Sequence, residues 1–220
     1  MKKWFLNNYK QYICVIISII LLAIVNVFFN NSNFGSDSIF CLNQGVSKFL
    51  KIEIGYATLI MNGLFVVIML IINRKEIGVG TILTILFLGP LINIIIKLNI
   101  IPDLASVELP TVPYVLLQIA YILIALVLGG ISISLFIHTN RGLSAFEGVL
   151  TKIASVTKIP FWAVKIISDI IFFIVGFLLG GTIHIGSIIS AILYGPSISL
   201  FSKVWKKLNL FQERKNEKNF

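Results

Sequence analysis

A sixteen-residue phrase in the first half of the chain returns in the second half and constrains the fold more than any other feature. Residues 77–92 read IGVGTILTILFLGPLI, and residues 183–198 read IHIGSIISAILYGPSI. Each copy lies in a long apolar stretch, so the sequence predicts two related halves embedded in a membrane. The shared positions, at an offset of 106 residues, are Gly80 and Gly186, Thr81 and Ser187, Gly89 and Gly195, and Pro90 and Pro196.

The composition supports the membrane class. Apolar residues make up 57% of the chain and charged residues only 12%, whereas a soluble domain carries about a quarter charged residues. The net charge of +9 does not indicate nucleic acid binding, because the basic residues flank apolar segments instead of lining one exposed face. They indicate membrane topology, and we expect contacts with lipid but none with nucleic acid.

Six apolar segments are long enough for the roughly 20 residues that cross a bilayer, and they must be helical because lipid offers the backbone no hydrogen bonds. We expect an all-α membrane protein with one membrane domain over 1–220, a joint at 99–111 that holds three prolines, and a basic cytoplasmic tail at 203–220. The six expected spans are about 11–29, 56–73, 80–98, 112–137, 160–180 and 183–202.

The charges between these segments alternate. Basic clusters come before the first span, between the second and third, after the fourth and after the sixth, and the remaining connections are balanced, acidic or uncharged. Six spans with both termini in the cytoplasm of a bacterium place every basic cluster on one side. Each half, about 11–98 and 112–202, then holds three spans. An odd number inverts the second half relative to the first, so the sequence predicts an inverted repeat.

Two polar segments occupy matching places after the first span of each half. Residues 34–52 and 139–159 both open near a glycine, Gly35 and Gly142, and both show amphipathic periodicity. They are predicted to be interfacial helices, shallow re-entrant helices or ordinary amphipathic loops.

The second copy of the phrase also carries a resemblance. LLGGTIHIGSIISAILYGP, residues 178–196, resembles the signature of the YczE/YyaS/YitT family of bacterial membrane proteins. Lys165 and Asp169 match a basic-x-x-x-acidic pair of that family, and Glu147 matches an acid. The chain departs from the pattern at Ala145, where the family has a proline. The resemblance implies a multi-span protein of the cytoplasmic membrane and no defined activity.

The two Gly-Pro pairs predict helix interruptions near mid-membrane. Proline removes a helix hydrogen bond, and paired interruptions in inverted halves mark the binding site of many transporters. We therefore place Gly89, Pro90, Gly195 and Pro196 in a candidate site for a solute or ion. The alternative is that both pairs are packing kinks at which glycine allows close helix contact.

The small residues that begin each copy of the phrase predict helix starts. Gly80 with Thr81, and Gly186 with Ser187, are suited to capping free backbone amides, and they could instead bind an anion there. Capping is the favoured interpretation.

An acidic side chain inside an apolar span is costly and commonly functional. Asp169 lies in such a segment, and Lys165 lies one helical turn before it on the same face. This pair is either a proton, cation or substrate site or a structural ion pair. Glu147 is expected to approach Asp169 if residues 139–159 form a re-entrant helix.

No nucleophile motif, nucleotide-binding loop or metal-binding spacing is present, so we expect no cofactor, no metal and no enzymatic activity. The favoured function is a small secondary transporter or exporter of an unidentified solute or ion, working by alternating access. The alternative is a non-transporting scaffold that docks a partner membrane protein. A lipid-modifying enzyme has less support, and a homodimer remains open.

Overall fold

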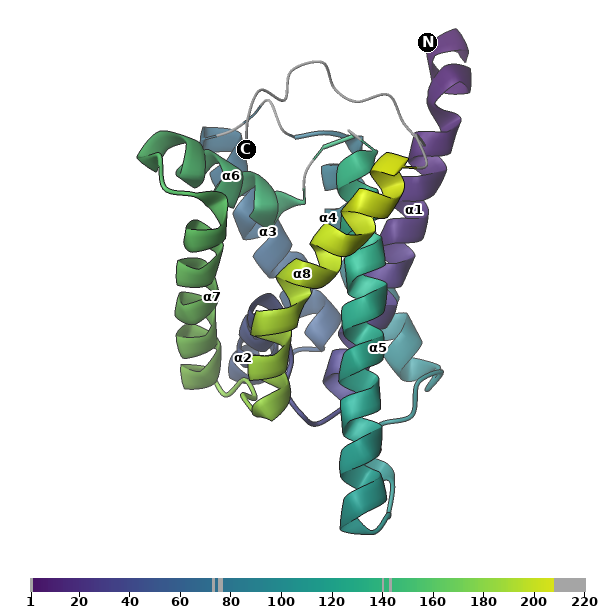
Figure 1. Cartoon of the computed structure of the whole chain (residues 1–220), viewed down its shortest axis with the longest axis vertical. Helices are drawn as coiled ribbons and strands as arrows, with labels where there is room; N and C mark the ends of the chain where they lie inside the picture. The colour runs from purple at the N-terminus through teal and green to yellow at the C-terminus, as the bar shows by residue number, and fades with distance from the viewer. Residues whose placement is uncertain (1, 73, 75–76, 140, 143, 208–220) are drawn as a thin grey trace.

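The computed structural model describes residues 2–72, 74, 77–139, 141–142 and 144–207, and within them the chain is helical with no strand (Figure 1). Their apolar sequences leave helices as the only way to satisfy the backbone in lipid. The α-helices are α1 (Lys2–Asn31), α2 (Ser38–Leu50), α3 (Ile54–Ile72), α4 (Val79–Lys97), α5 (Thr111–His138), α6 (Ala145–Thr157), α7 (Phe161–Leu178) and α8 (Ile185–Lys207), and the joint between the halves holds a short 3-10 helix, η2 (Leu104–Ser106).

Five helices are long and apolar enough to cross a membrane, namely α1, α3, α4, α5 and α8. They correspond to five of the six expected spans. The remaining segment forms α7, which has 18 residues and includes Lys165 and Asp169; its crossing of the membrane stays a prediction. Helix α8 continues through Lys207 and so takes in the start of the predicted tail, and the membrane boundary of the last span stays a prediction. Residues 208–220 of that tail lie outside the described residues.

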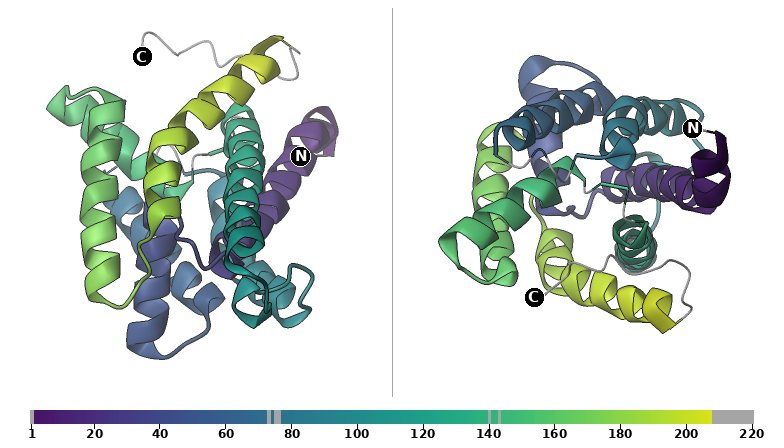
Figure 2. Two further views of the ribbon diagram at one scale, coloured as in Figure 1. Left: turned by 60° about the horizontal axis from the view of Figure 1, so that its bottom comes forward. Right: turned by 90° about the horizontal axis from the view of Figure 1, so that it is seen from above.

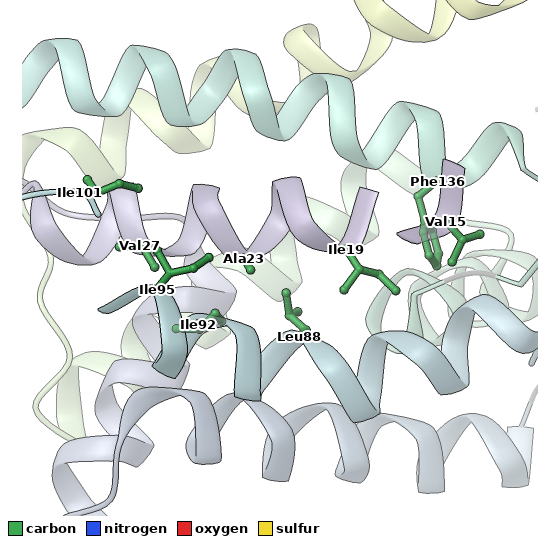
Figure 3. Packing of buried hydrophobic residues seen from close by; sticks show 9 residues of the cluster. All are labelled: Val15, Ile19, Ala23, Val27, Leu88, Ile92, Ile95, Ile101 and Phe136. Atoms are coloured by element: carbon green, nitrogen blue, oxygen red, sulfur yellow. The ribbon is translucent and has the colours of Figure 1, made fainter. Parts of the chain in front are cut away.

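The core of the first half forms where α1 packs between α4 and α5 (Figure 3). Val15, Ile19, Ala23 and Val27 recur every four residues along one side of α1 and are buried against Leu88 and its neighbours in α4. This spacing keeps the buried side chains on one helical face. Large apolar side chains remain exposed on the outer faces of the helices, where lipid is the suitable solvent.

The long helices alternate in direction. The loop after α5 meets the start of α1, where Arg141 Nε donates to Gln11 Oε1 over 2.6 Å, so α1 and α5 are antiparallel. Ser197 of α8 bonds to Leu126, and Trp205 of α8 bonds to Ser134, so α8 runs parallel to α5. Figures 1 and 2 show that α7 descends beside this bundle and that a tight connection returns the chain upward into α8.

The two halves have matching neighbours. The packing of α1 on α4 corresponds to that of α5 on α8, α2 on α7 corresponds to α6 on α3, and α2 on α3 corresponds to α6 on α7. The close packing of α3 on α4 has no comparable counterpart between α7 and α8 within the described residues. The halves therefore share one plan and differ at one interface.

The short segments after the first helix of each half are helices with buried faces, which rules out the alternative of ordinary loops. Both α2 and α6 have 13 residues, and each ends at a lysine with a left-handed backbone, Lys51 (φ 55°) and Lys158 (φ 58°). Helix α2 packs on α7 and α6 packs on α3. Each short helix therefore lies against the second long helix of the other half, α7 or α3.

A pair of exchanged contacts joins the halves at the repeated phrase. The Gly186 amide at the start of α8 donates to the Phe34 carbonyl over 2.8 Å, and the Gly80 amide at the start of α4 donates to the Arg141 carbonyl over 2.9 Å. The next residue on each loop is a glycine with positive φ, Gly35 (104°) or Gly142 (115°), which lets the loop lie directly on the helix start. We call these two contacts the exchanged clasps.

Both prolines of the repeated phrase lie inside continuous helices, which corrects the predicted interruptions. Pro90 is within α4 and Pro196 is within α8. A proline removes one amide donor, and the hydrogen bonds on either side can carry the helix onward. No pair of free helix ends is formed at mid-membrane by these two residues.

The clasps predict a sharp difference between two glycines. A β-carbon at Gly186 would collide with the Phe34 carbonyl, whereas one at Gly63 on α3 meets nothing within 4 Å. We expect Gly186→Ala to destabilise the protein by about 1–3 kcal/mol, which is typical of overpacking. Thermal melting of the detergent-purified protein measures this. Gly63→Ala is the control and should melt at or slightly above the wild-type temperature. Equal melting of the two variants would mean that the clasp is not tightly packed.

Candidate functional site

Four charged side chains come together where α2, α6 and α7 meet. Asp37 caps the start of α2, where its side chain accepts from the Phe40 amide over 3.3 Å. Glu147 lies in the first turn of α6. Lys165 and Asp169 are one turn apart on α7, as the sequence predicted. The cluster thus combines three carboxyl groups with one ammonium group, and we call it the charged cluster.

Lys165 and Asp169 form an ion pair. The Nζ to Oδ1 distance is 2.5 Å, and the two side chains are 29% and 18% exposed. The Ser38 hydroxyl donates to the same Asp169 oxygen over 2.5 Å, which ties the first turn of α2 to α7. Asp169 is therefore neutralised and doubly bonded, which is the structural alternative foreseen for this residue.

The other two carboxyl groups have no cation of their own. Burial raises the pKa of Asp37 to about 6, and Lys165 acts against this rise. Burial also raises the pKa of Glu147, again opposed by Lys165. Glu147 Oε2 is buried and has no hydrogen-bond partner within the described residues. A buried acceptor left without a donor is costly, so this oxygen is suited to a ligand or a proton.

A cavity of about 110 Å³ lies at the meeting point of the halves. Asp37, Glu147 and Lys165 line it, together with aromatic and small polar side chains. Its walls contain pairs of residues that occupy equivalent places in the two halves, at offsets of 106 or 107 residues. These pairs are Asn26 and Ile133, Phe29 and Phe136, Asp37 and Ser144, Ile39 and Phe146, Phe40 and Glu147, Thr58 and Lys165, and Leu88 and Tyr194.

A larger cavity of about 700 Å³ occupies the gap between α7 and α8. Its walls run from Lys203 and Lys206, near the end of α8, down to Asp169 and Ser38. Asp37, Lys165, Tyr194 and Ile198 line both cavities. The charged cluster therefore lies between the central cavity and a wide opening on the α7–α8 side.

The two Gly-Pro pairs have different surroundings. Gly195 and Pro196 line the larger cavity, and a β-carbon at Gly195 would meet nothing within 4 Å. Gly89 is in direct contact with the backbone of Gly55 on α3, and neither it nor Pro90 lines these two cavities. The prediction that both pairs face one site is wrong for the first pair, which has the predicted alternative role of close helix packing.

The glycine and hydroxyl residues at the helix starts lie in the exchanged clasps and not in these cavities. Ser187 Oγ accepts from the Ser36 amide over 3.1 Å, and Thr81 Oγ1 accepts from the Gly78 amide over 3.2 Å. These contacts agree with the capping interpretation, and the Gly80 and Gly186 amides are already used by carbonyl groups instead of an anion.

Asp37 is a site residue that the sequence did not indicate. Asp37 lies in a segment with balanced charge, two residues past Gly35, and nothing local marks it as buried. The signal is its equivalence to Ser144, the N-cap of α6, since both follow a glycine at the same distance. Comparing the halves position by position would have placed both residues at one site.

A family model of proteins of unknown function, DUF6198, matches residues 9–203. The chain belongs to this family. No curated protein and no solved structure matches it. The match gives no link to the YczE/YyaS/YitT family, so that resemblance stays a sequence-based expectation. What is established is a polytopic helical membrane protein of the DUF6198 family.

The charged cluster also predicts a stability difference. Asp169→Asn leaves the Lys165 ammonium without its partner, and breaking a partly buried pair should cost about 1–3 kcal/mol. The double variant Lys165→Thr/Asp169→Asn should recover part of this loss, because it installs the neutral residues found at the equivalent places on α3, Thr58 and Asn62. Thermal melting in detergent measures both.

The control is the exposed ion pair of Glu53 and Lys97, whose side chains are 43% and 65% exposed. Glu53→Gln should change stability by less than about 1 kcal/mol. If Asp169→Asn has the same melting temperature as Glu53→Gln, the Lys165–Asp169 pair makes no contribution to stability.

Proposed function

We propose that this DUF6198 protein is a small secondary transporter that moves its solute by alternating access. It crosses a bacterial cytoplasmic membrane six times, with α7 as the sixth span and both termini in the cytoplasm. The central cavity holds the solute, and no chemical step is needed. The following observations support this.

The direction and charge of the helices favour six crossings. Helix α7 must return the chain from the end where α6 lies to the end where α8 begins (Figure 1). When the charged cluster is set apart, the described segments at one end of the bundle carry eight basic and no acidic side chains, and those at the other carry three basic and three acidic ones. Basic residues concentrate on the cytoplasmic side of membrane proteins. The first set, at the start of α1, after α3, after α5, on α6 and at the end of α8, is Lys10, Arg74, Arg141, Lys152, Lys158, Lys203, Lys206 and Lys207, and the second, at the ends of α2 and α4 and in the segments that follow them, is Lys48, Lys51, Lys97, Glu53, Asp103 and Glu108.

The matched neighbours of the two halves favour an inverted repeat. Helices α1, α3 and α4 correspond to α5, α7 and α8, and the antiparallel α1 and α5 begin at opposite ends of the bundle. An axis in the membrane plane relates such halves, and substrates bind near mid-membrane at the repeat interface. The central cavity has this location, because equivalent residues of both halves line it.

The single observation that carries the proposal is the difference between two equivalent interfaces. Helices α3 and α4 are closed on one another at Gly55 and Gly89, where the Gly55 amide also donates to Asn93 Oδ1 over 2.8 Å. Helices α7 and α8 enclose the larger cavity. When two halves share a plan, exchanging their conformations gives a second state that is open at α3–α4 and closed at α7–α8. This exchange is alternating access.

The scaffold alternative predicts a dry bundle in which Lys165 neutralises Asp169. The ion pair agrees with it, whereas two cavities that meet at the carboxyl group of Asp37, which has no cation of its own, do not. The transporter therefore has the stronger support.

Thiol labelling tests the proposal in membrane vesicles of defined orientation. The background carries Cys14→Ser and Cys41→Ala, which removes the two native thiols. Ser199→Cys on α8 lines the larger cavity and should react with a membrane-impermeant maleimide added on the basic side. Asn62→Cys on α3 lines the central cavity and should react from the opposite side, through molecules in the exchanged state.

Glu108→Cys, which is exposed on the less basic end, is the control for side-specific labelling. Labelling of Asn62→Cys only from the basic side, or from neither side, would contradict alternating access. A static scaffold gives that result.

A further inference from the structure

The charge balance of the central cavity is negative. Two carboxyl groups, from Asp37 and Glu147, line it with the ammonium group of Lys165, and that ammonium is already bonded to Asp169, which lines only the larger cavity. Buried charges are normally paired because an unpaired ion loses its hydration without compensation. The site therefore lacks positive charge, and a cation would supply it.

Acceptors without donors mark where a ligand would bind. Glu147 Oε2 and Asn43 Oδ1 are both buried without a hydrogen-bond partner within the described residues, and both residues line the central cavity. Asn43 is only 3% exposed. Two orphan acceptors in one small cavity call for a group that donates several hydrogen bonds, which an ammonium or guanidinium group does.

The walls of the cavity are suited to an organic cation. Phe29, Phe40, Phe136 and Phe146 line it and are at most 3% exposed, and Tyr194 closes one side. Aromatic faces attract cations, most strongly when water is excluded. The Lys165 ammonium already uses this attraction, since its Nζ lies 5.2 Å from the centroid of the Phe146 ring. The cavity thus already contains one ammonium group beside an aromatic ring, and a bound cation would make the same kind of contact.

Size and geometry separate the possible cations. The described residues offer no group of three or more His, Cys, Asp or Glu side chains that could hold a metal ion. The volume of about 110 Å³ exceeds the space of one water and is below that of a drug-sized site. Aromatic walls favour a cation with apolar surface over a bare inorganic ion.

From these observations we propose that the central cavity binds a small monovalent organic cation with an ammonium or guanidinium group, between Glu147, Asp37 and the aromatic walls. This substrate class rests on the proposed transport function. Lys203 and Lys206 line only the larger cavity and are exposed. Salt therefore screens their repulsion of a cation in the central cavity.

Thermal melting of the purified full-length protein tests binding without assuming transport. Methylammonium and tetramethylammonium chloride are the probes, and potassium chloride at equal ionic strength is the baseline. Binding to the folded state raises the melting temperature with ligand concentration. We expect at least one probe to raise it saturably, and sodium acetate to give no rise.

Glu147→Gln removes the unpaired carboxylate and should weaken the apparent affinity at least tenfold. Glu108→Gln is the matched control, since it makes the same change at an exposed residue outside both cavities, and it should bind as the wild type does. Asp37→Asn is the second variant and should also weaken binding. No rise with either cation in the wild-type protein, or an equal rise in Glu147→Gln, would overturn the inference.

Counterflow in proteoliposomes separates this inference from the proposed function. If methylammonium binds in a Glu147-dependent manner but radiolabelled methylammonium is not exchanged, the cation site stands and the transport proposal fails. If Asn62→Cys labels from the side opposite to Ser199→Cys but neither cation binds, transport stands and the substrate class is wrong.

Discussion

The exchanged clasps are the contacts on which the rest of the structure depends. A helix start leaves backbone amides without partners, and in a membrane such amides cannot turn to water. The amides of Gly186 and Gly80 are satisfied by carbonyl groups of loops from the opposite half. Neither half therefore completes its last helix alone. The same loops lead directly into α2 and α6, so the contact that joins the halves also places Asp37 and Glu147 beside α7. One pair of hydrogen bonds thus takes part both in joining the halves and in placing the site.

The site shows how a duplicated unit acquires chemistry without changing shape. At three of the equivalent wall positions one half has a charged residue and the other a neutral one: Lys165 and Thr58, Glu147 and Phe40, and Asp37 and Ser144. The packing also compensates across the repeat. Gly148 on α6 accommodates Met69 on α3, and at the matching contact Gly176 on α7 accommodates the backbone at Cys41 on α2. Large and small residues have exchanged sides while the helices kept their spacing. The paired rings of Phe65 and Phe172, which occupy equivalent places, both contact Phe146.

Sequence reasoning reached the parts of this structure that depend on local spacing. The repeated phrase predicted two related halves, the hydroxyls of Thr81 and Ser187 predicted caps, and the four-residue spacing of Lys165 and Asp169 predicted their contact. It failed where the outcome depends on distant neighbours. Gly89 and Gly195 stand in the same dipeptide, yet one is packed against Gly55 and the other faces a cavity. The unpaired oxygen of Glu147 could not be foreseen, because it depends on which hydrogen-bond donors the neighbouring helices α2 and α7 bring near it.

The difference between the two glycines has a local cause on the partner helix. At the closed interface the Asn93 side chain reaches across to the Gly55 amide over 2.8 Å. The equivalent residue on α8 is Ser199, whose side chain is shorter by the length of an amide group and lines the larger cavity. The hydrogen bond that holds α3 on α4 therefore has no counterpart of equal reach between α7 and α8. A single hydrogen bond contributes only about 0.5–1.5 kcal/mol, which is the size of bias that favours one of two similar packings without forbidding the other. The opening beside the charged cluster thus accompanies two residue differences between the halves, Asn93 against Ser199 and Gly55 against Trp162.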